Sequence, residues 1–363
     1  MGADRKAVKG RGASEQVSNR FSQRTLGPVH WEGIDEVTGE EGVPTKYLFE
    51  QPRSILNEVK APDLGFRWSL NPYQGCEHGC SYCYARPTHE YWGYSAGLDF
   101  ERVIMVKRNA PSLLEKALRD ERWTAEPVMM SGATDPYQPI ERTEGLTRQC
   151  LEVFLRFEHP VQVITKNALI LRDLDILTEL ASKRLVSVAI SLTTLNEDLR
   201  RIMEPRTATA ARRSDTIRAL SEAGVPVHAM LAPLIPSIND HEVPALLKAA
   251  SEAGASSAGY TVLRTNGPVE KVFRNWLELH FPDRAAKVIA QTSAMHGGSM
   301  GDSEAGRRLR GEGPFALSIR RTFNVFRQRY FSGRHYPGLD RTRFHRPPEG
   351  QLDLFDQHGY ADI

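Results

Sequence analysis

Between residues 67 and 280 the chain alternates short apolar runs with longer amphipathic stretches. The apolar runs, which we expect to be strands, are Arg67–Leu70, Val103–Lys107, Val128–Ser131, Val161–Thr165, Leu185–Ser191, Val227–Leu234 and Gly259–Leu263. The amphipathic stretches, which we expect to be helices, are Ser112–Arg119, Glu144–Phe157, Leu171–Lys183, Ser214–Ala223, His241–Ala253 and Pro268–His280. This alternation is typical of βαβ units with a parallel sheet. We predict an α/β fold, and so many strands in a chain segment of roughly 200 residues favour a barrel or partial barrel.

The regions that flank this pattern differ from it. Residues 1–60 are polar and interrupted by Gly and Pro, and the regular alternation stops after about Phe281. We predict five regions: a mobile basic terminus (1–26), an irregular N-terminal arm (27–66), the barrel (67–280), a basic helical extension (281–346) and a tail (347–363).

The amino-terminal sequence predicts no export. Met1–Arg20 holds five basic residues but lacks the apolar core of a signal peptide. Apolar runs such as Met230–Ile235 fall far below the ~20 residues that span a bilayer. We therefore expect a cytoplasmic protein with reduced thiols and no membrane association.

Three of the four cysteines in the 363-residue chain, Cys76, Cys80 and Cys83, fall within eight positions. Four cysteines are too few for a disulfide scaffold, and 40% hydrophobic residues suffice for a sizeable core. The spacing C-x3-C-x2-C directly after the first strand suits three irons of a [4Fe–4S] cluster, with the fourth iron open. Gly75 and Gly79 would let the backbone wrap closely around such a group. The alternative is a Cys3His zinc site that includes His78, although no distal ligand pair is evident.

This motif, with Tyr82 before the last cysteine, resembles the radical S-adenosylmethionine (SAM) enzymes. Four further segments resemble the spore photoproduct lyase-like branch of that superfamily: Ser131–Glu141, Ile164–Asn167, Ser191–Thr193 and Met203–Arg206. The resemblance covers Leu70 to Leu263 and implies a partial (β/α)6 TIM barrel.

The resemblance also implies chemistry. The open iron would bind SAM, and an electron from a donor such as a flavodoxin or ferredoxin would cleave SAM to methionine and a 5′-deoxyadenosyl radical that abstracts hydrogen. The positions that match cofactor-binding segments are Ser131, Thr134, Asp135, Lys166, Ser191, Glu204 and Arg206, and Tyr84 matches a hydrogen relay. Alternatives stay open: Lys166 as a surface lysine, Ser191 as a strand-end cap, Glu204 paired with Arg206, and Tyr84 in packing.

One departure concerns the lyase reaction itself. The lyase has a hydrogen-donating cysteine in the segment that reads Ser131-Gly132-Ala133-Thr134 here, and this segment contains none. Cys150 lies in a helical apolar pattern and is expected to be a buried core residue. The resemblance therefore implies radical generation but not the lyase substrate.

The carboxyl-terminal part is strongly basic. Residues 306–346 hold eleven arginines against two acids, a local net charge of +9 in a chain of net charge +2. Ile319, Phe323, Phe326 and Tyr330 form an apolar helix stripe, and Arg320, Arg321, Arg327 and Arg329 fall outside it. Arginines among aromatics are typical of surfaces that bind phosphates and stack on bases. The alternative is a capping helix with solvated arginines.

Near the end, Gln351-Leu352-Asp353-Leu354-Phe355 resembles the pentapeptide with which bacterial polymerases and repair proteins bind the sliding clamp. Leu352, Leu354 and Phe355 would fill an apolar pocket while Gln351 makes a polar anchor. Alternatively, this segment folds back on the barrel.

The sequence therefore predicts a radical SAM enzyme that acts on DNA, in repair or modification, and is recruited by the sliding clamp. The first alternative is the same chemistry on RNA or a protein. The second is a non-catalytic zinc- or cluster-bearing protein that binds nucleic acid.

Overall fold

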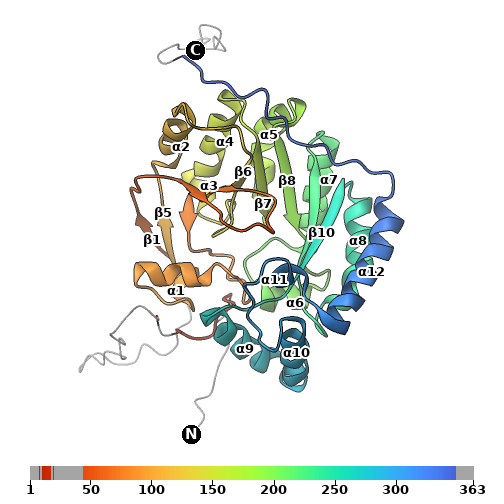
Figure 1. The fold of residues 1–363 in the computed structure, drawn as a ribbon. Helices are drawn as coiled ribbons and strands as arrows, with labels where there is room; N and C mark the ends of the chain where they lie inside the picture. The colour runs from red at the N-terminus through yellow and green to blue at the C-terminus, as the bar shows by residue number, and fades with distance from the viewer. Residues whose placement is uncertain (1–7, 9, 18, 20–43, 349–363) are drawn as a thin grey trace, which may run out of the picture.

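In the computed structural model, which describes residues 8, 10–17, 19 and 44–348, a seven-stranded sheet forms the centre of the fold (Figure 1). Its strand order is β10-β9-β8-β7-β6-β3-β2. Six strands run parallel: β3 (Trp68–Leu70), β6 (Val128–Met130), β7 (Val161–Thr165), β8 (Val186–Ser191), β9 (Val227–Leu234) and β10 (Ser257–Val262). β2 (Leu56–Glu58) adds to β3 in the antiparallel direction. The predicted α/β fold with a parallel sheet is confirmed.

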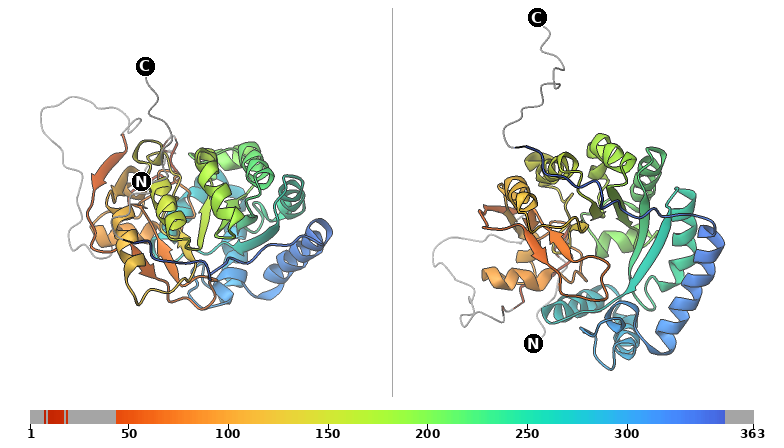
Figure 2. Two further views of the ribbon diagram at one scale, coloured as in Figure 1. Left: turned by 90° about the horizontal axis from the view of Figure 1, so that it is seen from above. Right: turned by 45° about the horizontal axis from the view of Figure 1, so that its top comes forward.

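Helices cover the outer face of this sheet (Figures 1 and 2). They are α2 (Ala110–Arg119), α4 (Leu146–Arg156), α5 (Leu174–Ser182), α7 (Ala210–Glu222) and α8 (Val243–Glu252). β7 alternates accordingly: Val161 and Val163 are buried in the apolar core with the helices, whereas Gln162 and Ile164 are only partly buried. The main core therefore lies between sheet and helices.

Val103–Lys107 is not part of the barrel, contrary to our prediction. β5 (Val103–Val106) instead pairs with β1 (Lys46–Phe49) and β4 (Tyr73–Gln74) in a separate three-stranded sheet. All four residues of β5 are buried, as in a barrel strand, so a short apolar run does not reveal which sheet it joins. β1 and β2 also give regular structure to an arm that we expected to be irregular.

The remaining helices lie in connections and in the carboxyl-terminal extension. Those in connections are η1 (Arg86–Trp92), α1 (Asp99–Arg102), α3 (Glu141–Glu144), η2 (Ala168–Asp173), α6 (Glu197–Met203) and η3 (Asp240–Glu242). α9 (Pro268–His280), α10 (Pro282–Met295), α11 (Arg307–Arg310) and α12 (Gly313–Phe331) follow the last strand. α12 packs on α8 and β10 and buries Ile319 and Phe323, as its apolar stripe predicted.

After α12 the chain crosses the amino-terminal end of the barrel (Figure 2, right). Asp340 N donates to Arg184 O, and His345 N donates to Phe157 O, so the segment is fixed to the turns that precede β8 and β7. Arg119 in turn donates to Pro347 O at 2.8 Å. This segment therefore closes the end of the barrel opposite to the carboxyl ends of the strands.

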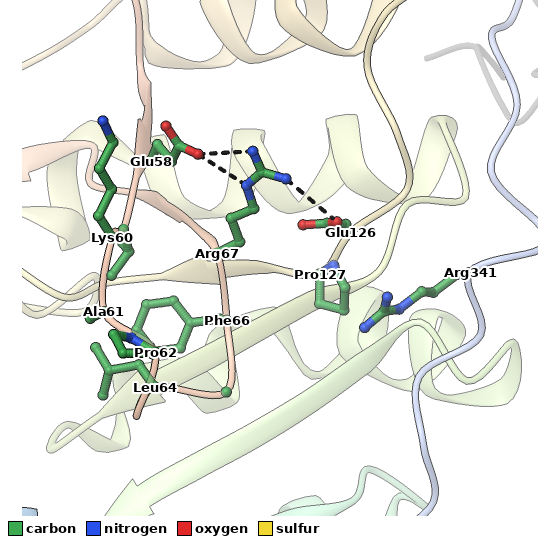
Figure 3. Close-up of a pocket in the computed structure, with 12 residues that line it drawn as sticks. Glu58, Lys60, Ala61, Pro62, Leu64, Phe66, Arg67, Glu126, Pro127 and Arg341 are labelled. Carbon is green, nitrogen blue, oxygen red and sulfur yellow. Dashed lines mark hydrogen bonds and ion pairs between the residues drawn. The ribbon is translucent and has the colours of Figure 1, made fainter. Parts of the chain in front are cut away.

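A groove of about 480 Å³ lies beneath the turn between β2 and β3 (Figure 3). Arg67 crosses it, with Glu58 at 2.9 Å and Glu126 at 4.0 Å. None of the predicted site residues that the structure describes lines this groove.

In the described part of the chain, no helix is long and apolar enough to cross a membrane.

Candidate functional site

The three clustered cysteines lie on the loop after β3 and β4, at the carboxyl end of the sheet. They line one pocket together with residues from the ends of three further strands. Its lining is Cys76, His78, Cys80, Cys83, Tyr84, Ala85, Ser131, Gly132, Thr134, Asp135, Ile164, Thr165, Lys166 and Ser191. Because parallel strands end at one edge, side chains far apart in the sequence meet here, where barrels of this type place their active sites.

Backbone hydrogen bonds and two glycines shape the cysteine loop. Cys76 N donates to Phe100 O, and Ser81 N donates to Met203 O. Gly75 and Gly79 have φ of 77° and 66°, which favour glycine. A Cβ on Gly79 would also lie 2.7 Å from Glu101 Oε2, so another residue could not take its place without displacing this carboxylate.

Arg86 and Glu101 hold the loop from behind. Both side chains are fully buried, 2.5 Å apart. Arg86 donates to Cys80 O through Nε and Nη2, at 3.1 and 2.8 Å. A bidentate guanidinium thereby fixes the backbone at the second cysteine, and Glu101 neutralises its charge.

The amino-terminal segment also belongs to this site. Gly12 N and Ala13 N donate to the two oxygens of Glu101, at 3.1 and 2.8 Å. Arg11 donates to Glu101 O, and Ala13 and Val17 are buried. Residues 11–17, which we predicted to be mobile, therefore pack against the cysteine loop, because Glu101 supplies acceptors for their backbone.

Asp135 joins the ends of β6 and β7. Its Oδ1 accepts from Thr165 Oγ1 at 2.7 Å, its Oδ2 accepts from Lys166 N at 2.8 Å, and His78 Nδ1 lies 3.3 Å away. Burial disfavours the charged form, but His78 and these hydrogen bonds outweigh it and hold the pKa of Asp135 at about 2. Both oxygens are engaged by the protein, so Asp135 positions the strand ends.

Ser131 and Thr134 are likewise engaged by the backbone. Ser131 Oγ donates to Thr134 O, and Thr134 Oγ1 donates to Gly75 O, each at 2.5 Å. Ser131 has a positive φ of 109° and Gly132 one of 136°. The segment therefore turns sharply at the pocket wall and presents its backbone beside the cysteines.

Lys166 and Ser191 line the pocket, whereas Glu204 and Arg206 do not. Glu204 is buried and pairs with Arg213 at 2.5 Å, rather than with Arg206, and it also accepts from Tyr82 and Thr193. Arg206 is exposed and lines a separate basic pocket of about 620 Å³ with Arg142 and Arg212. Glu204 thus supports the cysteine loop from below, through Tyr82.

The position of His78 bears on the zinc alternative. Its Nδ1 faces Asp135, and its Nε2 lies 3.3 Å from Asn167 Nδ2. Both ring nitrogens thus face groups other than the three thiols. Among the described residues, no three His, Cys, Asp or Glu side chains are close enough to hold a single metal ion.

The donor set fits an iron–sulfur cluster. Burial raises the pKa of all three thiols, so their thiolate forms need bound iron for stabilisation. Three sulfur donors on one glycine-containing loop, beside a pocket lined by hydroxyls and Lys166, suit a cluster with an open iron and a polar cofactor next to it. Cys76, Cys80 and Cys83 would hold the cluster.

Two other predictions concern Tyr84 and Cys150. Tyr84 lines the pocket, and the residue is 61% exposed. Cys150 is fully buried in the core between sheet and helices, as expected, and lies outside the pocket.

The predicted nucleic-acid arginines are all exposed on α12 but do not share one face. Arg320 and Arg327 are seven residues apart and lie on the same side of the helix, whereas Arg321 and Arg329 point in other directions. None of the four pairs with a carboxylate of the described residues. Gln351, Leu352, Leu354 and Phe355 lie outside the described residues.

Sequence reasoning missed the residues that support the loop: Arg86, Glu101, Gln138 and Arg213. Gln138 Oε1 accepts from Glu77 N at 3.0 Å, and Gln138 lies inside a segment that we had singled out. No local sequence pattern indicates the roles of Arg86, Glu101 and Arg213, because their partners are distant in the sequence or are backbone atoms.

Comparison with known proteins agrees with this site. The family model described as the radical SAM superfamily matches residues 70–250, which include all three cysteines. An uncharacterized protein of Mycobacterium tuberculosis is 35% identical over 238 residues, 65% of this chain and 70% of the relative. One of Methanocaldococcus jannaschii is 28% identical over 241 residues, 66% of this chain and 85% of the relative.

Among solved structures, spore photoproduct lyase in complex with dinucleoside spore photoproduct has the same fold. The TM-score is 0.59 at 16% sequence identity, over 79% of this chain and 80% of the lyase. A lyase variant with bound SAM and the same dinucleoside gives a TM-score of 0.58 at 16% identity, over 80% and 82% of the two chains.

Proposed function

Because this chain belongs to the radical SAM superfamily, whose enzymes use a [4Fe–4S] cluster and SAM, we propose that it acts on DNA, in repair or modification. When bound, the cluster and SAM supply a 5′-deoxyadenosyl radical that abstracts hydrogen from a substrate. Cys76, Cys80 and Cys83 hold the cluster. Ser131, Thr134, Lys166 and Ser191 bind SAM, and Asp135 and Glu204 position the loops that do so.

One observation carries the choice of a nucleic acid: arginines that have no carboxylate partner among the described residues flank the edge strand β10. Arg310 lies 4.3 Å above the ring of Tyr260 in β10, and Arg320 and Arg327 share one side of α12, which packs on the same strand. Guanidinium groups in such a row suit a phosphate backbone. Within the nucleic acids, the similar fold of spore photoproduct lyase, a protein solved with dinucleoside spore photoproduct, supports DNA.

Tyr84 stands beside this pocket, and we propose that it relays hydrogen between cofactor and substrate. Its exposed ring adjoins Cys83 and would meet whatever enters the barrel mouth. Without a cysteine between Ser131 and Thr134, the chain would need another hydrogen donor than the lyase has.

Isotope transfer tests the substrate class. The anaerobically reconstituted enzyme is given dithionite, SAM and deuterated DNA, and 5′-deoxyadenosine is analysed by mass spectrometry. We expect deuterium in the product with wild-type protein and no product with Cys80→Ala. If deuterium reached 5′-deoxyadenosine from RNA or from a deuterated protein extract but not from DNA, the proposed substrate class would be wrong. If no 5′-deoxyadenosine formed with any of these substrates, the proposal that the protein is a radical SAM enzyme would be refuted.

Recruitment by the sliding clamp is the second part of the proposal. It rests on the match of Gln351–Phe355 to the clamp-binding pentapeptide and on the preceding segment, which leads away across the closed end of the barrel. The purified clamp should bind wild-type protein, and the double substitution Leu354→Ala, Phe355→Ala should abolish binding. A matched change of Asp353→Ala, the variable position of the motif, should leave it intact. Equal binding by all three proteins would exclude recruitment through this motif.

A further inference from the structure

The last strand is followed by an arginine that forms no ion pair with a carboxylate of the described residues. Arg264 follows β10 by two residues and is partly buried. Its neighbours fix it, because Leu263 N donates to Leu234 O and Thr265 N donates to Met300 O. The guanidinium donates to Asp302 O at 3.3 Å.

The acids nearest to Arg264 are committed to other arginines. Asp63 binds Arg308 through two hydrogen bonds, and Asp302 accepts from Arg307 Nε at 2.8 Å. Arg307 and Arg308 therefore have ion-pair partners, whereas Arg264 has none among the residues that the structure describes. A partly desolvated cation without a counterion is costly, so the arrangement calls for an anion supplied from outside.

The position of Arg264 in the fold indicates which kind of anion would bind it. Arg264 follows the carboxyl end of β10, and the cysteine pocket lies at the carboxyl ends of β6, β7 and β8 in the same parallel sheet. It also stands at the carboxyl end of the edge strand that Arg310 and Arg327 flank further along, both close enough to act on His228 of β9. The three cations thus follow one edge of the barrel toward the pocket.

We infer that Arg264 binds a phosphodiester group of the substrate strand at the barrel mouth. This inference rests on the proposed action on nucleic acid and adds a residue to it. Guanidinium is suited to the role, because its planar donors match phosphate oxygens. Arg310 and Arg327 would contact phosphates farther along the same strand.

Salt-dependent binding of full-length reconstituted protein to fluorescein-labelled single-stranded DNA, and to RNA of the same sequence, tests the inference. Arg264→Gln should weaken binding about tenfold and reduce the slope of log K against log[KCl] by about 0.7. Arg264→Lys, which keeps a point charge, should restore the slope. The control Arg218→Gln removes an exposed arginine paired with Asp215 on α7 and should change neither quantity.

The outcomes separate the two proposals. If wild-type protein binds neither DNA nor RNA, the action on nucleic acid fails. If it binds and Arg264→Gln retains affinity and slope, only the inference on Arg264 fails. Should that variant misfold, phenylglyoxal labelling of wild-type protein decides: DNA or RNA must slow modification of Arg264, and an unchanged rate would overturn the inference.

Discussion

Asp63 and Arg308 join the two edges of the open sheet. Asp63 lies in the turn between β2 and β3, and Arg308 lies in α11, which packs on β10; β2 and β10 are the outermost strands (Figure 1). Arg308 Nε donates to Asp63 Oδ2 at 2.7 Å, and Gly306 N donates to the same oxygen at 3.0 Å. The ion pair lowers the pKa of Asp63. Asp63 thus bridges, through Arg308 and the backbone of Gly306, a gap that no strand of the described residues fills.

Replacing Asp63 by Asn should loosen this bridge. The amide keeps the shape but loses the charge, so amide hydrogen exchange in residues 59–66 and 306–308 should accelerate about tenfold. Glu58→Gln is the matched control, since it breaks a pair with Arg67 inside the same hairpin and leaves the bridge intact. Equal acceleration in both variants would show that the hairpin, not the bridge, limits opening.

The buried pair of Glu204 and Arg213 supports the cysteine loop through Tyr82. Arg213→Met should lower the free energy of unfolding by about 3–5 kcal/mol, because a buried carboxylate loses its counterion, and should reduce iron uptake on reconstitution. The double change Glu204→Gln, Arg213→Met should recover part of both losses. Urea unfolding and iron content measure them, with Arg218→Met as the exposed control. Wild-type iron uptake by Arg213→Met would refute the link to the loop.

His159 should make folding stability depend on pH. Its Nε2 accepts from Trp123 Nε1 at 3.0 Å, Nδ1 donates to Pro160 O, and burial lowers its pKa from 6.5 to about 4. As the pH falls, His159 of the unfolded chain therefore binds a proton at a higher pH than His159 of the folded chain. The neutral ring makes its full contribution to the free energy of unfolding above the pKa that His159 has in the unfolded chain. This contribution is lost as the pH falls toward the pKa of His159 in the folded chain, and the loss reaches roughly 2 kcal/mol by about pH 5.

The variant His159→Gln should be less stable than wild type at neutral pH but lose less stability on acidification. Urea midpoints measured from neutral pH down to about pH 5 give the two profiles. The control His241→Gln, at an exposed position, should keep the wild-type profile. Parallel profiles for wild type and His159→Gln would assign the pH dependence to other groups.

The barrel could be predicted because its signals are local. β7 and β9 have the bounds that their apolar runs predicted, and α9 matches Pro268–His280. α10 was missed, because Pro282 directly after α9 resembles the end of regular structure, whereas proline is well tolerated in the first turn of a helix. We assigned the run that forms β5 to the wrong sheet, because an apolar, buried strand does not indicate which strand it pairs with.

The site residues also fall into those that local sequence signals indicated and those that they did not. Strand-end residues such as Lys166 and Ser191 line one pocket with the cysteines, and the sequence indicated this because the carboxyl ends of parallel strands meet. Contacts of Glu101 with Gly12 and of Tyr82 with Glu204 span 89 and 122 positions, and no local pattern announces them. Only the folded chain shows that these carboxylates hold the cysteine loop.

Gly12 provides a test of the amino-terminal segment as a cover for that loop. A Cβ at Gly12 would lie 1.7 Å from Gly79 O, and therefore Gly12→Ala must lift the segment from Glu101. We expect the reconstituted cluster to bleach in air on the order of fivefold faster, and trypsin to cut at Arg11 sooner. Gly65→Ala is the control, since nothing lies within 4 Å of its added Cβ. Absorbance decay and mass spectrometry give the two rates; if Gly12→Ala decays like wild type, the segment does not shield the cluster.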